Sequence, residues 1–167
     1  MVSLIEISMM LLILSDMALL GLSRLRTCIN IVSFQGMLLG VFTIIAHMQG
    51  ITPRLVLIAA ANFILKGYVF PLLLRRGVRE ANVLNEIEPY VGYIMSILAG
   101  LGMLGISLWL GSKLPFKPGI GIQFAVPAAL TTFLTGLFLI IARRSALMQC
   151  LGYIILENGI YTIGIFS

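Results

Sequence analysis

Charged residues are scarce in this chain: Asp, Glu, Lys and Arg make up only 10% of its 167 residues, whereas 60% are hydrophobic. Soluble globular domains carry about 25% charged residues, so this scarcity excludes an ordinary soluble domain. The mean hydropathy of +1.10 leads to the same conclusion. The composition therefore indicates an integral membrane protein.

Histidine and cysteine are also scarce, with one histidine, His47, and two cysteines, Cys28 and Cys150. One histidine cannot build a multi-histidine metal site, and two cysteines without a CxxC spacing are too few to hold an iron–sulfur cluster. The sequence contains neither a nucleophile-elbow motif nor a phosphate-binding glycine pattern. We therefore expect no catalytic residue, bound metal or cofactor in this chain, and an interfacial position for His47.

Most of the chain consists of six apolar runs, each about 20 residues long and so able to cross a bilayer as a helix. The runs cover residues 4–22, 28–49, 55–74, 89–110, 122–142 and 146–167. Membrane β-barrels instead show segments of alternating polarity about 10 residues long, and the sequence has no such segments. The prediction is an all-α polytopic transmembrane helix bundle that forms a single transmembrane domain over residues 1–167.

Basic residues lie mainly in the short connections between the runs. The connections after the first, third and fifth runs hold seven of them, namely Arg24, Arg26, Arg75, Arg76, Arg79, Arg143 and Arg144. The other two connections hold three, namely Arg54, Lys113 and Lys117. Because basic loops favour the cytoplasmic side, we expect the N-terminus to lie outside. The formal net charge of +5 then reflects topology rather than nucleic-acid binding.

The third apolar run and the connection after it have two notable features. Pro71 lacks an amide hydrogen and frees a backbone carbonyl one turn earlier, so we expect a kink in this run. The connection 75–88 holds three basic and three acidic residues. It could dock a cytoplasmic partner or form a solvated turn.

Three ionisable residues fall deep inside the apolar runs: Asp16, Lys66 and Glu157. Glu157 lies 13 residues after Arg144, which is about 20 Å along a helix and near the bilayer centre. A charge at such depth costs at least about 2.5 kcal/mol unless it is paired or buried in protein. All three are therefore candidates for an ion path. The alternatives are helix-packing hydrogen bonds for Glu157, neutralisation of a partner subunit's carboxylate for Lys66, and a structural or lipid-facing role for Asp16.

Polar side chains accompany the two deeper candidates. Tyr153 and Tyr161 lie four residues before and after Glu157, where their hydroxyls could bond the carboxylate or hold water. Asn158 follows Glu157 directly, and Asn62 lies one turn before Lys66. These neighbours make two polar patches on otherwise apolar helices, as a buried hydrated path would require.

The second and sixth runs share a spacing. Gln35 follows Cys28 by seven residues, as Glu157 follows Cys150. Interpreted as a parallel repeat, this similarity predicts a seventh helix that is missing at the C-terminal end; chance similarity is the alternative. The "GMLLG" at 36–40 is a GxxxG pattern, which predicts close packing against another helix.

The segments "QCLGYIILENGIYTIGI", "FILKGYVFPLLL" and "SRLRTC" resemble the hydrogenase-4 component E family. That family is related to the K component of NADH-quinone oxidoreductase and the C component of multisubunit Na+/H+ antiporters, which resemble mainly the helix around Glu157. The resemblance implies a membrane-arm subunit of a group 4 [NiFe]-hydrogenase complex, such as a formate hydrogenlyase, in the prokaryotic cytoplasmic membrane. It also carries a relay role over to Glu157 and Lys66, but not to Asp16, which is outside the family pattern.

The resemblance implies a complex in which other subunits hold the redox centres. Antiporter-like and quinone-oxidoreductase-like membrane subunits and peripheral hydrogenase and iron–sulfur subunits would be the partners, with lipids around them. We thus expect a non-catalytic subunit that helps to move protons or sodium ions. Two other functions stay open: a structural subunit that packs between larger antiporter-like subunits, and a free-standing small transporter.

Overall fold

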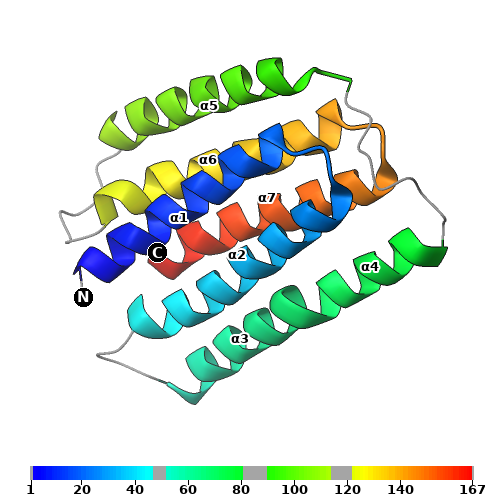
Figure 1. Cartoon of the computed structure of the whole chain (residues 1–167). Coiled ribbons are helices and arrows are strands. Elements are labelled where there is room, and N and C mark those ends of the chain that lie inside the picture. The colour runs from blue at the N-terminus through cyan, green and yellow to red at the C-terminus, as the bar shows by residue number, and fades with distance from the viewer. Residues whose placement is uncertain (1, 47–51, 81–89, 114–121, 167) are drawn as a thin grey trace.

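The computed structural model describes residues 2–46, 52–80, 90–113 and 122–166, and these residues are almost entirely helical. The elements in chain order are α1 (Val2–Gly21), α2 (Leu25–Ala46), α3 (Pro53–Ile64), the π-helical turn η1 (Leu65–Val69), α4 (Phe70–Glu80), α5 (Tyr93–Lys113), α6 (Ile122–Ala142) and α7 (Ala146–Phe166). Because α3, η1 and α4 follow one another without a break, the described residues form six helical passes that run side by side (Figure 1). The predicted all-α helix bundle is confirmed.

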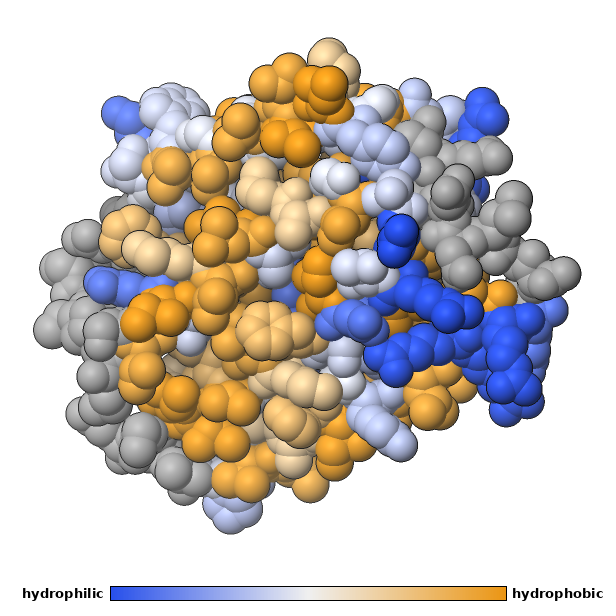
Figure 2. All heavy atoms as spheres, viewed as in Figure 1, coloured by the Kyte–Doolittle hydropathy of each residue, from blue (hydrophilic) through white to orange (hydrophobic). Residues whose placement is uncertain are grey.

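Five of the described passes are long and apolar enough to cross a membrane: α1, α2, the continuous α3–η1–α4, α5 and α6. The sixth, α7, has 21 residues but falls outside this set, because Gln149, Glu157 and Asn158 lower its hydropathy. Hydrophobic side chains dominate the face in Figure 2, and the most hydrophilic group on it lies toward the end of α4. These features are those of a polytopic membrane protein.

The helix α2 lies between the two sides of the bundle. Figure 1 shows α5 along one edge and α3 with α4 along the opposite edge, with the remaining helices between them. Helix α2 contacts α1, α7 and the whole α3–η1–α4 pass. The ends of α1, α4 and α6 lie at the same end of the bundle (Figure 1). The segments that hold the seven arginines of the predicted cytoplasmic connections therefore gather at that end.

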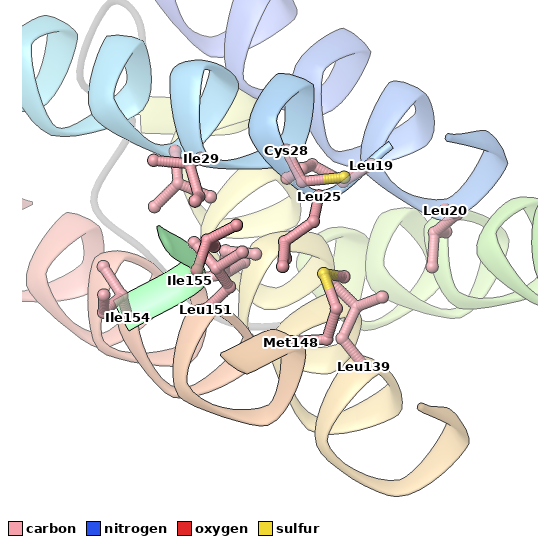
Figure 3. Close-up of a cluster of buried hydrophobic side chains, with 12 residues drawn as sticks. Leu19, Leu20, Leu25, Cys28, Ile29, Leu139, Met148, Leu151, Ile154 and Ile155 are labelled. Atoms are coloured by element: carbon pink, nitrogen blue, oxygen red, sulfur yellow. The ribbon is translucent and has the colours of Figure 1, made fainter. Parts of the chain in front are cut away.

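Most of the core is apolar, and a close backbone contact joins α6 to α7. Figure 3 shows the larger cluster of buried side chains, which includes Leu19, Leu25, Ile29, Leu139, Met148, Leu151 and Ile155. A Cβ atom on Gly136 would lie 2.4 Å from the backbone nitrogen of Leu156 and 2.6 Å from the carbonyl oxygen of Gly152. Only glycine allows the two backbones to approach so closely, as is common in membrane helix pairs.

The predicted helix limits agree with the structure to within four residues, apart from the end of the third run. We predicted that this helix ends at residue 74, but α4 continues to Glu80. The reason is that the last turns are amphipathic: Val78 is buried against the core while Arg75, Arg76 and Arg79 are exposed. His47 and residues 81–88 of the predicted connection lie outside the described residues.

Candidate functional site

The π-helical turn η1 places Lys66 on the inner side of its helix. Pro71 has no amide hydrogen, so the carbonyl oxygen of Gly67, four residues earlier, receives no α-helical hydrogen bond from it. The hydroxyl of Ser33 on α2 donates to this oxygen instead, at 2.5 Å. The amide of Phe70 donates to the carbonyl oxygen of Leu65, which gives the wider turn. A π turn therefore lies just before Pro71, and the expected kink stays a prediction.

The GxxxG pattern of α2 brings this turn into close contact with α2. A Cβ atom on Gly36 would lie 2.6 Å from the Cβ atom of Lys66, and one on Gly40 would lie 2.9 Å from the Cβ atom of Phe63. Lys66 itself is only 4% exposed. The predicted close packing is confirmed, and its partner is the α3–η1 segment.

The amine of Lys66 meets three polar or aromatic groups of α7. Its Nζ donates to Oδ1 of Asn158 at 3.0 Å and lies 3.4 Å from Oε1 of Glu157. It also lies 5.6 Å from the centre of the Tyr161 ring, which is within the range of a cation–π contact. We call these four residues the Lys66 centre. The sequence pointed to Lys66 and Glu157 separately, and the fold brings them into contact across 91 positions of the chain.

The two charged partners differ in exposure. The side chain of Lys66 is 5% exposed, whereas that of Glu157 is 46% exposed. Beside Glu157, a mainly apolar groove of about 380 Å³ runs between α4 and α7. The residues that line it are Phe70, Leu73, Leu74, Leu147, Cys150, Tyr153, Ile154 and Glu157. The carboxylate thus faces the buried amine on one side and an open groove on the other.

The supporting polar residues are arranged differently from the expectation. Tyr153 is 62% exposed and lines the groove, and Tyr161 hydrogen-bonds through its hydroxyl to Thr43 of α2 at 2.8 Å. Neither tyrosine hydrogen-bonds to Glu157 among the described residues. Asn62 turns its amide oxygen inward, where this atom is buried without a hydrogen-bond partner in the described part of the chain.

A second polar centre surrounds Asp16. Its Oδ1 accepts a hydrogen bond from Nε2 of Gln35 at 2.8 Å, and its Oδ2 lies 2.6 Å from the hydroxyl oxygen of Thr132. Nε2 of Gln35 also donates to the hydroxyl of Ser15 at 2.7 Å. We call these four residues the Asp16 centre. The lipid-facing alternative for Asp16 is wrong, because its side chain is 0% exposed.

The two centres lie against adjacent residues of α2. Gln35 contacts Asp16, whereas Gly36, the next residue, contacts Lys66. Oε1 of Gln35 and Nδ2 of Asn158 are both buried and lack a hydrogen-bond partner among the described residues. One of these atoms is an acceptor and the other a donor, so each centre presents an unused group of complementary type.

Arg143 has a structural role that its place in the sequence does not reveal, since we interpreted it as a topology signal like Arg144. Arg143 is 0% exposed. Its Nη2 donates to the carbonyl oxygen of Leu20 at 2.9 Å, and its guanidinium lies 5.3 Å from the centre of the Tyr93 ring. A cation at the C-terminus of α1 is favourable for the helix dipole. No local signal separates the two arginines, because the contact with Leu20 spans 123 positions.

Comparison with known proteins finds relatives that match most of the chain. No family model and no solved structure matches it. It is 30% identical over 152 residues to the uncharacterized protein Rv0085 of Mycobacterium tuberculosis, and the match covers 89% of this chain and 68% of that protein. The chain belongs to the same family as Rv0085.

A more distant similarity extends to hydrogenase components. Hydrogenase-4 component E of Escherichia coli K12 is 28% identical over 111 residues, which is 66% of this chain. The Shigella flexneri protein of the same name gives the same values. The chain spans about half the length of these hydrogenase components, because the match covers 51% of each.

Proposed function

We propose that this chain is a membrane-arm subunit of a redox-driven ion-translocating complex of the group 4 [NiFe]-hydrogenase type, in the prokaryotic cytoplasmic membrane. The observation that carries the proposal is the contact of Lys66 with Glu157 and Asn158 between helices of the bundle. The similarity to hydrogenase-4 component E supports membership in a complex. Under this proposal the nickel-iron and iron–sulfur centres belong to other subunits.

The chemistry of the pair suits a relay for protons or for a coupled sodium ion. Lysine, unlike arginine, can release its proton in a buried site. Lys66 and Glu157 can therefore exist as an ion pair or as a neutral amine and acid, and a proton that passes between them changes one state into the other. Asn158 holds the amine in place in both states, since its Oδ1 accepts from the amine whether or not the amine is charged.

The exposure of Glu157 favours a partner subunit over a free-standing transporter. A carboxylate that is 46% exposed near the middle of the bilayer would otherwise face hydrocarbon, where a charge is costly. A helix of an antiporter-like subunit with a polar or basic group at this depth would cover both the carboxylate and the apolar groove beside it. The path would then continue from Glu157 into that subunit.

The test is the substitution Glu157→Gln in the assembled complex, with redox turnover and redox-driven ion movement measured in the same membranes. The amide keeps most hydrogen bonding but cannot carry a proton, so we expect intact assembly and turnover with loss of ion movement. Glu80→Gln is the matched control, because Glu80 is exposed and pairs only with Arg76 at 2.6 Å among the described residues. Normal ion movement in the Glu157→Gln complex would contradict the proposal.

A purely structural subunit is the second candidate, and the packing of Gly159 favours it. A Cβ atom on Gly159 would lie 2.6 Å from the backbone nitrogen of Phe133 and 2.8 Å from the carbonyl oxygen of Ala129. The "LENG" segment therefore also serves the contact of α6 with α7. If this were its whole role, Gly159→Ala would abolish assembly while Glu157→Gln would leave assembly and ion movement unchanged.

A further inference from the structure

Asp16 is enclosed by neutral groups. The residue is 0% exposed, and its side chain hydrogen-bonds with the amide of Gln35 and the hydroxyl of Thr132. No Lys, Arg or His of the described residues lies within ion-pair distance of it, in contrast to Glu157. An ionised carboxylate without a cation is costly inside a membrane protein, and such a group becomes neutral instead.

The buried guanidinium of Arg143 contacts α1 at Leu20, four residues beyond Asp16, and does not pair with the Asp16 carboxyl group. The helices packed against α1 are α2, α5 and α6. Helix α2 carries Arg26 in its first turn and the thiol of Cys28, α5 has Tyr93 at its start and Lys113 at its end, and α6 contains no ionisable residue. On α1 itself the other ionisable residue is Glu6, 10 residues away, or about 15 Å along the helix.

The hydroxyl group of Thr132 has one hydrogen and two oxygen neighbours that could accept it. The hydroxyl oxygen of Thr132 lies 2.6 Å from Oδ2 of Asp16 and 2.9 Å from the carbonyl oxygen of Ala128. A hydroxyl has one hydrogen to donate, and a carbonyl oxygen can only accept. When Thr132 donates to Ala128, the shorter contact is a hydrogen bond only if Asp16 supplies the hydrogen.

The rest of the centre agrees with this assignment. The two amide hydrogens of Gln35 are both used, one for Ser15 and one for Oδ1 of Asp16. The hydroxyl of Ser15 donates to the carbonyl oxygen of Leu12 at 2.7 Å. With one proton on Oδ2 of Asp16, each of these contacts has one donor and one acceptor.

We infer that Asp16 is a proton-binding site: a carboxylic acid that keeps its proton at neutral pH and donates it to the hydroxyl oxygen of Thr132. The chain then holds two different acids near α2, the charge-paired Glu157 and the neutral Asp16. This inference does not depend on the proposed ion path, since it concerns different contacts.

The sequence makes the test selective, because Asp16 is the sole aspartate of the chain. Cell-free synthesis with aspartate labelled with carbon-13 at the side-chain carboxyl, followed by infrared spectroscopy of the full chain in liposomes at neutral pH, reports on Asp16 alone. We expect the label to shift a carbonyl band of a protonated carboxylic acid, and we expect Asp16→Asn to lose that band. A label that shifts only carboxylate bands would overturn the inference.

A pair of threonine variants tests the hydrogen-bond partner. Thr132→Val removes the acceptor, so the labelled acid band should persist and move to the higher frequency of an acid without this hydrogen bond. Thr131→Val is the control, because Thr131 donates to the carbonyl oxygen of Pro127 at 2.8 Å and does not bond Asp16. An acid band at the same frequency in Thr132→Val and the wild type would refute the assignment of Thr132 as acceptor.

Discussion

The Lys66 centre and the Asp16 centre contact neighbouring residues of α2, Gly36 and Gln35, yet the buried ionisable group is stabilised differently in each. Lys66 has a charged partner, Glu157, which is half-exposed toward a groove. Asp16 has only neutral partners among the described residues and is sealed from the surface. In the Lys66 centre, the groove gives the charged pair access to the surface. In the Asp16 centre, the carboxyl group has no such access.

The comparison shows that the depth of a polar residue in a helix does not determine its chemistry. Asp16 and Glu157 both interrupt apolar runs, and their side chains differ by one methylene. Their neighbours differ, because α7 faces the amine of Lys66 whereas α1 faces the amide of Gln35. We therefore expect the protonation and role of each acid to depend on these contacts.

The largest expected loss of stability comes from a substitution that disrupts the contact of α2 with the Lys66 centre. In Gly36→Ala the new Cβ atom would lie 2.6 Å from the Cβ atom of Lys66 and 3.0 Å from its backbone carbon. Such overpacking should destabilise the fold by about 2 to 3 kcal/mol, measured by thermal unfolding in micelles. Gly102→Ala is the control, because nothing lies within 4 Å of the added atom. Equal stability of the two variants would contradict the packing argument.

Substitutions of Asp16 should show whether its carboxyl group is neutral or negatively charged in the folded protein. Asp16→Ala removes the partners of Gln35 and Thr132 and should cost about 2 kcal/mol. Asp16→Asn keeps an acceptor for Gln35 and a donor for Thr132, so its cost should stay below about 0.5 kcal/mol, roughly half of a typical hydrogen bond. The measurement is unfolding of both variants under the same conditions. An asparagine variant as unstable as the alanine variant would show that a negative charge is needed.

Double-mutant cycles should show whether the two centres are energetically coupled. Lys66→Met combined with Glu157→Gln should give a coupling free energy of about 1 kcal/mol, since the residues are in contact but one of them is half-exposed. Lys66→Met combined with Asp16→Asn should be additive within about 0.5 kcal/mol, because Lys66 and Asp16 have different hydrogen-bond partners among the described residues. A strong coupling in the second cycle would mean that α2 transmits the state of one centre to the other.

The smallest expected effect concerns the edge of the Lys66 centre. Tyr161→Phe removes the hydroxyl that hydrogen-bonds Thr43 and should cost about 0.5 to 1 kcal/mol. Tyr153→Phe is the matched control and should change the unfolding free energy less, because Tyr153 is 62% exposed. The comparison fails if both changes have the same effect on unfolding of the purified chain.

The sequence pointed to the polar residues of the Lys66 centre but not to their contact. A lysine and a glutamate near the middle of separate apolar helices each carry a charge cost, and only the structure shows that Lys66 contacts Glu157. The role of Asn158 as the nearer partner of the amine could not be predicted, because it depends on the rotation of α7 about its axis. That rotation follows from the close contact of α6 with α7 at glycines such as Gly136.

The contacts of the Asp16 centre and the burial of Arg143 could not be predicted from the sequence. The partners of Asp16 come from α2 and α6, which are 19 and 116 positions away, and no pattern in the sequence pairs them. Arg143 resembles Arg144 in the sequence, although only Arg143 reaches the end of α1. Long-range contacts of this kind depend on which faces of the helices meet.

The sequence by itself determined the helical class, the number of passes and the places where the helices are interrupted by polar residues. It could do so because apolar runs of bilayer length and basic connections act through composition, which needs no knowledge of neighbours. The tertiary structure decided that Lys66 meets Glu157, that Asp16 meets neutral groups and that Arg143 is buried. These outcomes depend on helix rotation and on the close approach of backbones at glycines, which arise only when the helices pack together.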